Sequence, residues 1–260
     1  MDINQILAVF DQERRDLPFT GSRRKVTPSL VRDVALEGDH SWIAYSHHSP
    51  ATLDAAIEAQ IDYFRGIGHS FEWKVFDHDQ PPNLRERLLA HGFEAGEAEA
   101  FMALDIRDAP AALLAPVTHD VRRVVSPDDV DDYRTVSEQV WGRERAGDID
   151  FVADLLRDSP DETAVYVAYV DGIPASCARA SFQQGSQFAG MWAGKTVPRF
   201  RKRGLYQALV AARVQEARRR GYRFMTIDAL PTSRPIVERH GFQFLTYTHP
   251  LVWHPSHGGR

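Results

Sequence analysis

One short segment combines residue types and a spacing that suit the binding of an anion. Residues 201–206 have the sequence RKRGLY. A strand-like run ends just before them at Val197-Pro198, and a helix-like run begins within them, near Gly204. The first amides of a helix have no acceptor within the helix, and the helix dipole adds partial positive charge there. Because Gly204 has no Cβ, a ligand can approach this backbone closely. We expect a pyrophosphate or a ribose phosphate to bind at this turn.

Cationic side chains surround the same turn, at Arg199, Arg201, Lys202 and Arg203. On charge alone, a solvated surface loop is the simpler interpretation, because basic runs are common on protein surfaces. A nucleic-acid patch is a further alternative, but no aromatic residues alternate with the cations and no known module surrounds them. The neighbouring elements must decide between these interpretations.

The second half of the chain has the pattern of a mixed α and β domain. Ser126-Pro127 is a helix start signal, and Asp171-Gly172 is a good hairpin turn. Gly190 and Gly194 indicate a bulge within a strand. We predict strands over 121–125, 164–170, 173–182, 188–197 and 224–228, with one or two more in 242–253, and helices over 126–140, 150–157, 205–219 and 232–240.

The first half repeats the order found at the end of the second half. An amphipathic helix carries Leu53, Ile57, Ile61 and Phe64, and a strand over 71–76, a helix over 84–93 and a strand over 101–106 follow. The tripeptide His-Gly-Phe ends the last predicted helix of each half, at 91–93 and 240–242. The shared order favours an internal duplication over a chance recurrence of the tripeptide.

Bulk composition is that of a soluble globular protein. The 260 residues carry a net charge of −5, which argues against nucleic-acid binding through overall charge. No apolar run approaches the roughly 20 residues of a membrane span, and the acidic N-terminal segment does not resemble a secretory signal. A single cysteine, Cys177, excludes an intramolecular disulfide and fits a reducing compartment. We therefore expect a cytoplasmic protein with no membrane or nucleic-acid partner.

The phosphate turn and its setting resemble the GNAT superfamily of acyl-CoA-dependent N-acyltransferases. The family's loop has the form Arg or Gln, two residues, Gly, one residue, then Gly or Ala, commonly with a Pro three residues before the Arg. Pro198, Arg201 and Gly204 have this spacing, and Gly241-Phe242 matches the Gly-Phe that closes the family's last short helix. The resemblance covers 121–253. It implies transfer of an acetyl group from acetyl-CoA, a co-substrate, to a small-molecule or peptide amine.

The resemblance also implies roles for individual residues. The backbone of the turn would hold the pyrophosphate, and the end of the preceding strand would pair with the pantetheine arm. An N–H group there would polarise the thioester carbonyl, and the amine would attack directly. The predicted cofactor-binding residues are Gly194, Lys195, Thr196, Val197, Arg201, Lys202, Arg203, Gly204, Leu205 and Tyr206.

The resemblance also indicates the domain organisation. We predict an α+β chain with two GNAT-like mixed α/β domains in tandem, each a central twisted, mainly antiparallel sheet flanked by helices. The first spans 1–107 and lacks the cofactor loop, the Ala- and Pro-rich segment 108–119 is a linker, and 120–260 binds acetyl-CoA. The first half would have a structural role, and a monomer is compatible with this arrangement because the two halves mimic a dimer.

Three positions depart from the family pattern. Tyr206 stands where the loop usually has its second small residue, so its side chain must turn away from the phosphates. Val237 stands where the family often has a tyrosine that acts as general acid to the leaving thiolate. An Asn and an Ala common upstream correspond to Leu230 and Ser233. Ser233 and Tyr206 are weak candidates to replace the acid, and the efficiency of turnover stays open.

The general base and the acceptor site are less clearly marked. Asp228 ends a strand beside the expected site and is a candidate base, although a strand-end acid that caps the following turn is the favoured interpretation. Glu138 is a second candidate. The acceptor pocket should involve the helix over 126–140 and the loop after it, and its candidate residues are Trp141, Arg143, Glu144 and Asp148. Trp141 could equally be a core residue, and Trp192, an aromatic residue within a strand, is interpreted as core.

A metal site is not indicated by the eleven histidines. The local clusters are His47-His48, His78 between Asp77 and Asp79, and His254 with His257, and none has the spacing of a structural zinc site. We expect loop and tail residues there and no bound metal. Cys177 lies in a strand-like run and is interpreted as a small core residue.

Overall fold

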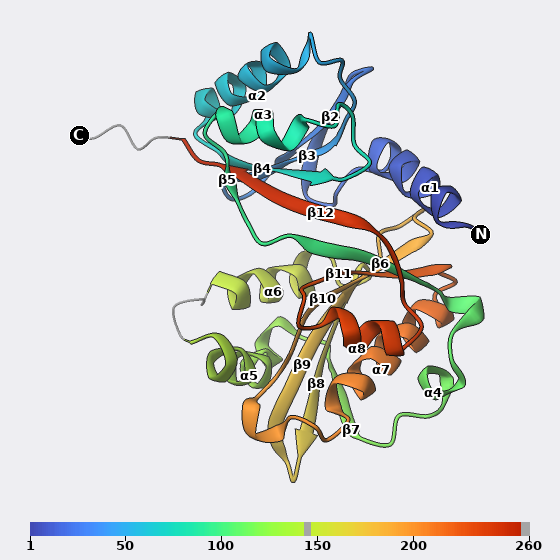
Figure 1. The fold of residues 1–260 in the computed structure, drawn as a ribbon. Helices are drawn as coiled ribbons and strands as arrows, with labels where there is room; N and C mark the ends of the chain where they lie inside the picture. Colours follow the sequence, from blue (N-terminus) through green and yellow to red (C-terminus); the bar gives the residue numbers. More distant parts are fainter. Residues whose placement is uncertain (143–146, 256–260) are drawn as a thin grey trace. The chain divides into compact units, whose positions relative to one another are not determined.

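The computed structural model describes residues 1–142 and 147–255, and for 147–148 it describes the backbone alone (Figure 1). The chain forms two compact units. Unit 1 contains Met1–Phe101, Ala229–Arg234 and the described residues from Phe244 onward. Unit 2 contains Met102–Asp228 and Pro235–Gln243, so two short segments of the second half belong to unit 1.

Unit 1 is built on a mainly antiparallel sheet with the strand order β1-β2-β3-β4-β12. Only the β3–β4 pair among these strands is parallel, and β5 pairs with β12. Its elements are α1 (Ile3–Asp16), β1 (Ser22–Val26), β2 (Leu30–Ala35), β3 (His40–Ser46), α2 (Leu53–Ile67), β4 (Ser70–Phe76), α3 (Leu84–Ala90), β5 (Glu94–Ala95) and β12 (Gln243–Trp253).

Unit 2 has the strand order β6-β11-β10-β9-β8-β7, in which β10 and β11 are parallel and β7 to β10 are antiparallel neighbours. Its strands are β6 (Glu99–Asp105), which begins in unit 1, β7 (Asp120–Val124), β8 (Thr163–Val170), β9 (Ile173–Ser181), β10 (Phe188–Thr196) and β11 (Phe224–Ala229). Its α-helices are α4 (Ala111–Leu114), α5 (Asp131–Trp141), α6 (Gly147–Asp158), α7 (Leu205–Arg219) and α8 (Arg234–Arg239). Short 3₁₀ turns lie at Ile106–Asp108, Pro127–Asp129 and Pro198–Phe200.

The two units share a motif in which a helix connects two parallel strands. In unit 1, α2 has 15 residues and connects β3 to β4, and in unit 2, α7 also has 15 residues and connects β10 to β11. Each of these helices shows the same closing bond to the residue five positions before, His69 N–H to Phe64 and Tyr222 N–H to Ala217. The following short helices close alike, because Phe93 N–H donates to Leu88 and Phe242 N–H donates to Val237.

These parallels support the predicted α+β fold and tandem arrangement. The bounds of α7 are those predicted for it, because its buried stripe and the basic residues before Gly221 define both ends. The prediction was incomplete elsewhere. It omitted α1, β1, β2 and β3, and the segment predicted as a linker contains α4, in which Leu113 is fully buried. Gln215 Nε2 of α7 donates to the Leu113 and Ala115 carbonyls, which fixes that segment within unit 2.

Candidate functional site

β10 and β11 separate partway along their length. Their parallel pairing runs from Phe188–Phe224 to Met191–Ile227, and within the described residues no further pair follows, although β10 continues to Thr196. A bulge between Trp192 and Lys195 interrupts the pairing of β10 with β9 at the same level, and Ala193 there has a φ of 51°. The bulge predicted from the two glycines is therefore confirmed. It leaves the end of β10 paired on one edge only.

The backbone at this strand end is oriented by β9. The Val197 N–H donates to Ala175 O, so that amide is occupied. Because successive residues of a strand point their N–H groups to opposite edges, the Thr196 N–H faces away from β9. The carbonyls of Lys195 and Thr196 accept from the Ser176 hydroxyl and the Arg201 Nε. The edge of β10 that faces away from β9 thus offers amide donors where β11 has turned aside.

The N-terminus of α7 follows directly and has the features of an anion site. Gly204 adopts a left-handed conformation with φ 76°, and no side chain caps the first amides of α7. No acidic residue lies in its first turn. Arg199, Arg201, Lys202 and Arg203 are exposed, and none of them is paired with a carboxylate among the described residues. Free amides, the helix dipole and unpaired cations act in the same direction here.

His119 lies against this turn and was not predicted as a site residue. Its Nε2 is 2.9 Å from Arg203 O, and a Cβ on Gly204 would come within 3.1 Å of the same nitrogen. No sequence signal marks it, because it lies 84 positions before Arg203 in the segment predicted as a linker. Its ring rests on the backbone of the predicted phosphate loop.

The other predicted loop residues divide into backbone and side-chain contributors. Leu205 is buried in the core, so only its amide can face a ligand. Lys195 is also buried, and its Nζ lies 3.6 Å from the Trp141 ring centre and 4.8 Å from that of Tyr133. Its ammonium group therefore stacks on aromatic rings of α5 and does not point toward the phosphate turn.

The Tyr206 side chain points away from the predicted phosphate turn, as its size requires. Its ring lies beside Gly194, where Cε2 would be 3.1 Å from a Cβ at that position. Any larger residue at 194 would press on the tyrosine ring. The glycine at 194 in the strand and the large residue at 206 in the loop are thus sterically complementary.

The candidate acid and base positions have unequal access. Asp228 follows Ile227, the last β11 residue paired with β10, so it lies where the two strands separate. Val237 is fully buried in α8 and has no proton to donate. The Ser233 hydroxyl donates to Leu230 O, so it closes a local turn. Glu138 lies on α5 and is half-buried.

The two tryptophans that could belong either to the site or to the core are exposed. Trp141 is 40% exposed and Trp192 is 37% exposed, so the core interpretation is wrong for both. The Trp192 Nε1 donates to Ser181 Oγ, and the indole lies over Gly190, where a Cβ would come within 2.6 Å of Nε1. Arg143 and Glu144 lie outside the described residues, as does the side chain of Asp148.

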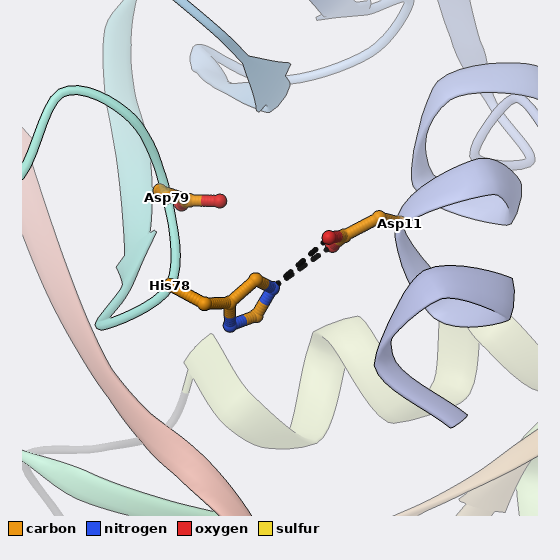
Figure 2. Close-up of side chains that lie close together, drawn as sticks. All are labelled: Asp11, His78 and Asp79. Carbon is orange, nitrogen blue, oxygen red and sulfur yellow. Dashed lines mark hydrogen bonds and ion pairs between the residues drawn. The ribbon is translucent and has the colours of Figure 1, made fainter. Parts of the chain in front are cut away.

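One group in unit 1 has a composition that could hold a metal ion. Figure 2 shows Asp11 on α1 facing His78 and Asp79, which lie in the loop after β4, with two dashed contacts between His78 and Asp11. Arg14 belongs to the same group, since its Nη1 lies 2.8 Å from Asp11 Oδ1 and 3.1 Å from Asp79 Oδ1. A guanidinium that already pairs with both carboxylates would repel a cation. We interpret the group as a link between α1 and the β4 loop.

The remaining histidine and cysteine predictions have simple outcomes. His48 lies in the loop after β3, as predicted, and its burial lowers its pKa. His254 follows β12 and His257 lies outside the described residues. Cys177 is fully buried in β9, as predicted for a core residue. Among the described residues, no helix combines the length and the apolarity that crossing a membrane requires.

The sequence and the fold were compared with those of known proteins. Residues 128–242 match the model of the acetyltransferase (GNAT) family. No match to the sequence was found among curated proteins.

Solved structures extend the likeness to almost the whole chain. A GCN5-related N-acetyltransferase from Kribbella flavida has a TM-score of 0.68 and 16% identity, over 98% of this chain and 95% of that one. A functionally unknown conserved protein from Staphylococcus epidermidis has a TM-score of 0.65 and 14% identity, over 91% and 95%. A tandem GNAT protein from the clavulanic acid biosynthesis pathway has a TM-score of 0.58 and 14% identity, over 99% and 96%. The fold is therefore that of GNAT proteins, with the tandem arrangement.

Proposed function

We propose that unit 2 is an N-acetyltransferase that moves an acetyl group from acetyl-CoA to a primary amine. The observation that carries the proposal is the separation of β10 from β11 directly before the uncapped N-terminus of α7. A phosphate-bearing ligand with an extended arm fits this pair of features, since amides at the turn suit phosphates and the open edge of β10 suits an amide-containing chain.

The residues of the turn would hold the pyrophosphate of acetyl-CoA. Backbone amides from Arg201 to Tyr206 would donate to it, and Lys202 and Arg203 would supply charge from exposed positions. His119 would contact the ligand from the opposite side of Gly204. The open edge of β10 over 194–197 would align the pantetheine arm.

The chemistry would take place where β10 and β11 separate. An amide of β10 such as Thr196 N–H would polarise the thioester carbonyl, because a fixed donor stabilises the charge that develops on that oxygen. Asp228 would accept the proton that the attacking amine loses, directly or through water. The acceptor would approach past α5, where Trp141 covers Lys195.

Thiol release from acetyl-CoA, measured against a panel of small amines, amino acids and peptides, tests the proposal. We expect turnover with at least one amine, and a decrease of about tenfold to a hundredfold in kcat for Asp228→Asn with little change in acetyl-CoA affinity. A matched control is Asp171→Asn, in the exposed β8–β9 turn.

The competing function is a non-catalytic acyl-CoA-binding module. The buried Val237 favours it, because the family's usual acid position cannot donate a proton. Tight acetyl-CoA binding without turnover on any member of the panel would support this alternative and contradict the enzyme.

A further inference from the structure

The phenol of Tyr206 lies at the open end of β10. Its ring carbons Cε2 and Cδ2 are 3.1 and 3.8 Å from the point where Gly194 would carry a Cβ. Tyr206 is half-buried and Gly194 is exposed. The tyrosine therefore borders the stretch of β10 that has lost β11 as a neighbour, and only a glycine at 194 leaves room for it.

Beneath this contact lies the guanidinium of Arg213, which is 1% exposed. Its Nε donates to Leu209 O at 2.9 Å and its Nη1 to Arg179 O at 3.4 Å, at the level of the bulge. Its Nη2 has no hydrogen-bond partner and lies 3.7 Å from the same Cβ point of Gly194.

No carboxylate pairs with Arg213 within the described part of the chain. A buried cation without a counter-ion is costly, so its position calls for an anionic or polar group that the resting protein does not supply. The ionisable groups that influence it are instead three phenols and a thiol, those of Tyr206, Tyr166, Tyr133 and Cys177.

Two features of its environment have opposite effects on the pKa of Tyr206. Burial raises the pKa of the Tyr206 phenol, while the Arg213 charge acts to lower it. The phenol is therefore protonated at neutral pH, and a phenolate formed there would have a fixed cation beside it.

We propose that Tyr206 is the general acid of unit 2 and that Arg213 is a positioning residue that stabilises the resulting phenolate. The inference rests on the proposed function. The amine nitrogen forms a bond to the thioester carbon, the C–S bond breaks with its electron pair on sulfur, and Tyr206 gives its proton to that sulfur. Asp228 or water takes the surplus proton of the amine, and water returns a proton to Tyr206. Two departures from the family pattern, a large residue at 206 and a valine at 237, then compensate for each other.

The first test removes the hydroxyl alone. Tyr206→Phe should lower kcat by about a hundredfold and leave acetyl-CoA affinity within about threefold, using the fastest amine of the panel. The native enzyme should lose activity at high pH as the phenol ionises, and the variant should lack this limb. Tyr222→Phe is the control, because the Tyr222 hydroxyl donates to Gln183 O elsewhere in unit 2. A Tyr206→Phe enzyme with native kcat and an unchanged pH profile would overturn the proposal.

The second test needs no acceptor. In protein labelled with ring-¹³C tyrosine, the Tyr206 resonance is assigned by its loss in Tyr206→Phe. CoA should shift that resonance, whereas adenosine 3′,5′-bisphosphate, which carries phosphates but no sulfur, should leave it in place. Arg213→Met should raise the Tyr206 titration midpoint. A Tyr206 chemical shift that does not change when CoA binds would overturn the inference while leaving cofactor binding intact. Absence of CoA binding to the native protein would overturn the proposed function itself.

Discussion

The two helices that connect parallel strands differ at their N-termini, although their lengths and closing bonds are alike. The first turn of α7 contains no acidic residue and is surrounded by exposed cations that pair with no carboxylate among the described residues. The first turn of α2 contains Asp54, a carboxylate paired with Arg87 and His91. An acid there already satisfies the positive end of the helix dipole, so a second anion would be repelled.

The strand ends that precede the helices differ in the same direction. In unit 1, the last β3–β4 pair is Ile43–Trp73, and the Trp73 indole donates to Ser46 Oγ with both residues buried. In unit 2, the last pair is Met191–Ile227, and three residues further along the strand is the exposed Gly194. A side chain thus bridges the strands in unit 1, while unit 2 keeps an open edge. The comparison supports one ligand site per chain, in unit 2.

The largest effect is expected from a carboxylate at the uncapped helix end. Gly204→Asp should weaken acetyl-CoA binding by about a hundredfold or more, because the new charge opposes the phosphates and its Cβ meets His119. Gly68→Asp is the matched control, since Gly68 also has a positive φ of 73° but lies at the C-terminus of α2 with open space around it. Titration calorimetry of both variants would measure the contrast. Equal losses in the two would show that backbone strain, and not charge at α7, is responsible.

A smaller effect is expected from the exposed cations. The double variant Lys202→Ala, Arg203→Ala should lose about fivefold to tenfold in acetyl-CoA affinity at low salt, and less at high salt because exposed charges are screened. The control is Arg23→Ala, Lys25→Ala, which removes the same charge from exposed positions of β1. Affinities measured at two ionic strengths decide the matter. A loss that does not depend on salt, or that also occurs in the β1 variant, would argue against a local phosphate contact.

The smallest effect on binding is expected in unit 1. Asp11→Asn should cost about 1 to 2 kcal/mol of unfolding free energy at pH 7, because Asp11 accepts hydrogen bonds from Arg14 and His78. Figure 2 shows the contact with His78. Acetyl-CoA affinity should be unchanged. Burial works to raise the pKa of Asp11, but the His78 hydrogen bond and the Arg14 charge hold it below its ordinary 3.8.

The pH dependence of this stabilisation follows from that direction. A depressed folded-state pKa means that the contribution of Asp11 is present above the unfolded value and is lost as pH falls through the folded value. The difference between native protein and Asp11→Asn should therefore shrink below about pH 4. Thermal unfolding at pH 7 and at acid pH checks this. A difference that grows toward low pH would contradict the assigned ion pairs.

Local patterns were sufficient for the elements around the site and insufficient for its side-chain contacts. The bounds of α7 and the β10 bulge follow from periodicity, glycines and capping signals in consecutive residues. The stacking of Lys195 on Trp141 joins residues that are distant in sequence, and its direction depends on packing against α5. The contact of Tyr206 with Gly194 was not predictable for the same reason, although the size of Tyr206 indicated that its ring must turn aside.

One signal in the sequence was present but unused. Arg213 stands four residues after Leu209 and eight after Leu205, on the buried stripe of α7. A charged residue at an apolar position of a periodic helix indicates either a partner or a function. The omission of β1 and β2 has a different cause, because Arg24 of β1 and Asp33 of β2 form a buried ion pair and interrupt the apolar alternation of these strands.

The stoichiometry of acetyl-CoA binding tests the central contrast between the two units most directly. Isothermal titration of the full chain should give one site per chain in the native protein, and the affinity of that site should fall by about a hundredfold or more in Gly204→Asp. Two sites per chain, or one site that keeps its native affinity in Gly204→Asp, would contradict the assignment of the single site to the turn before α7.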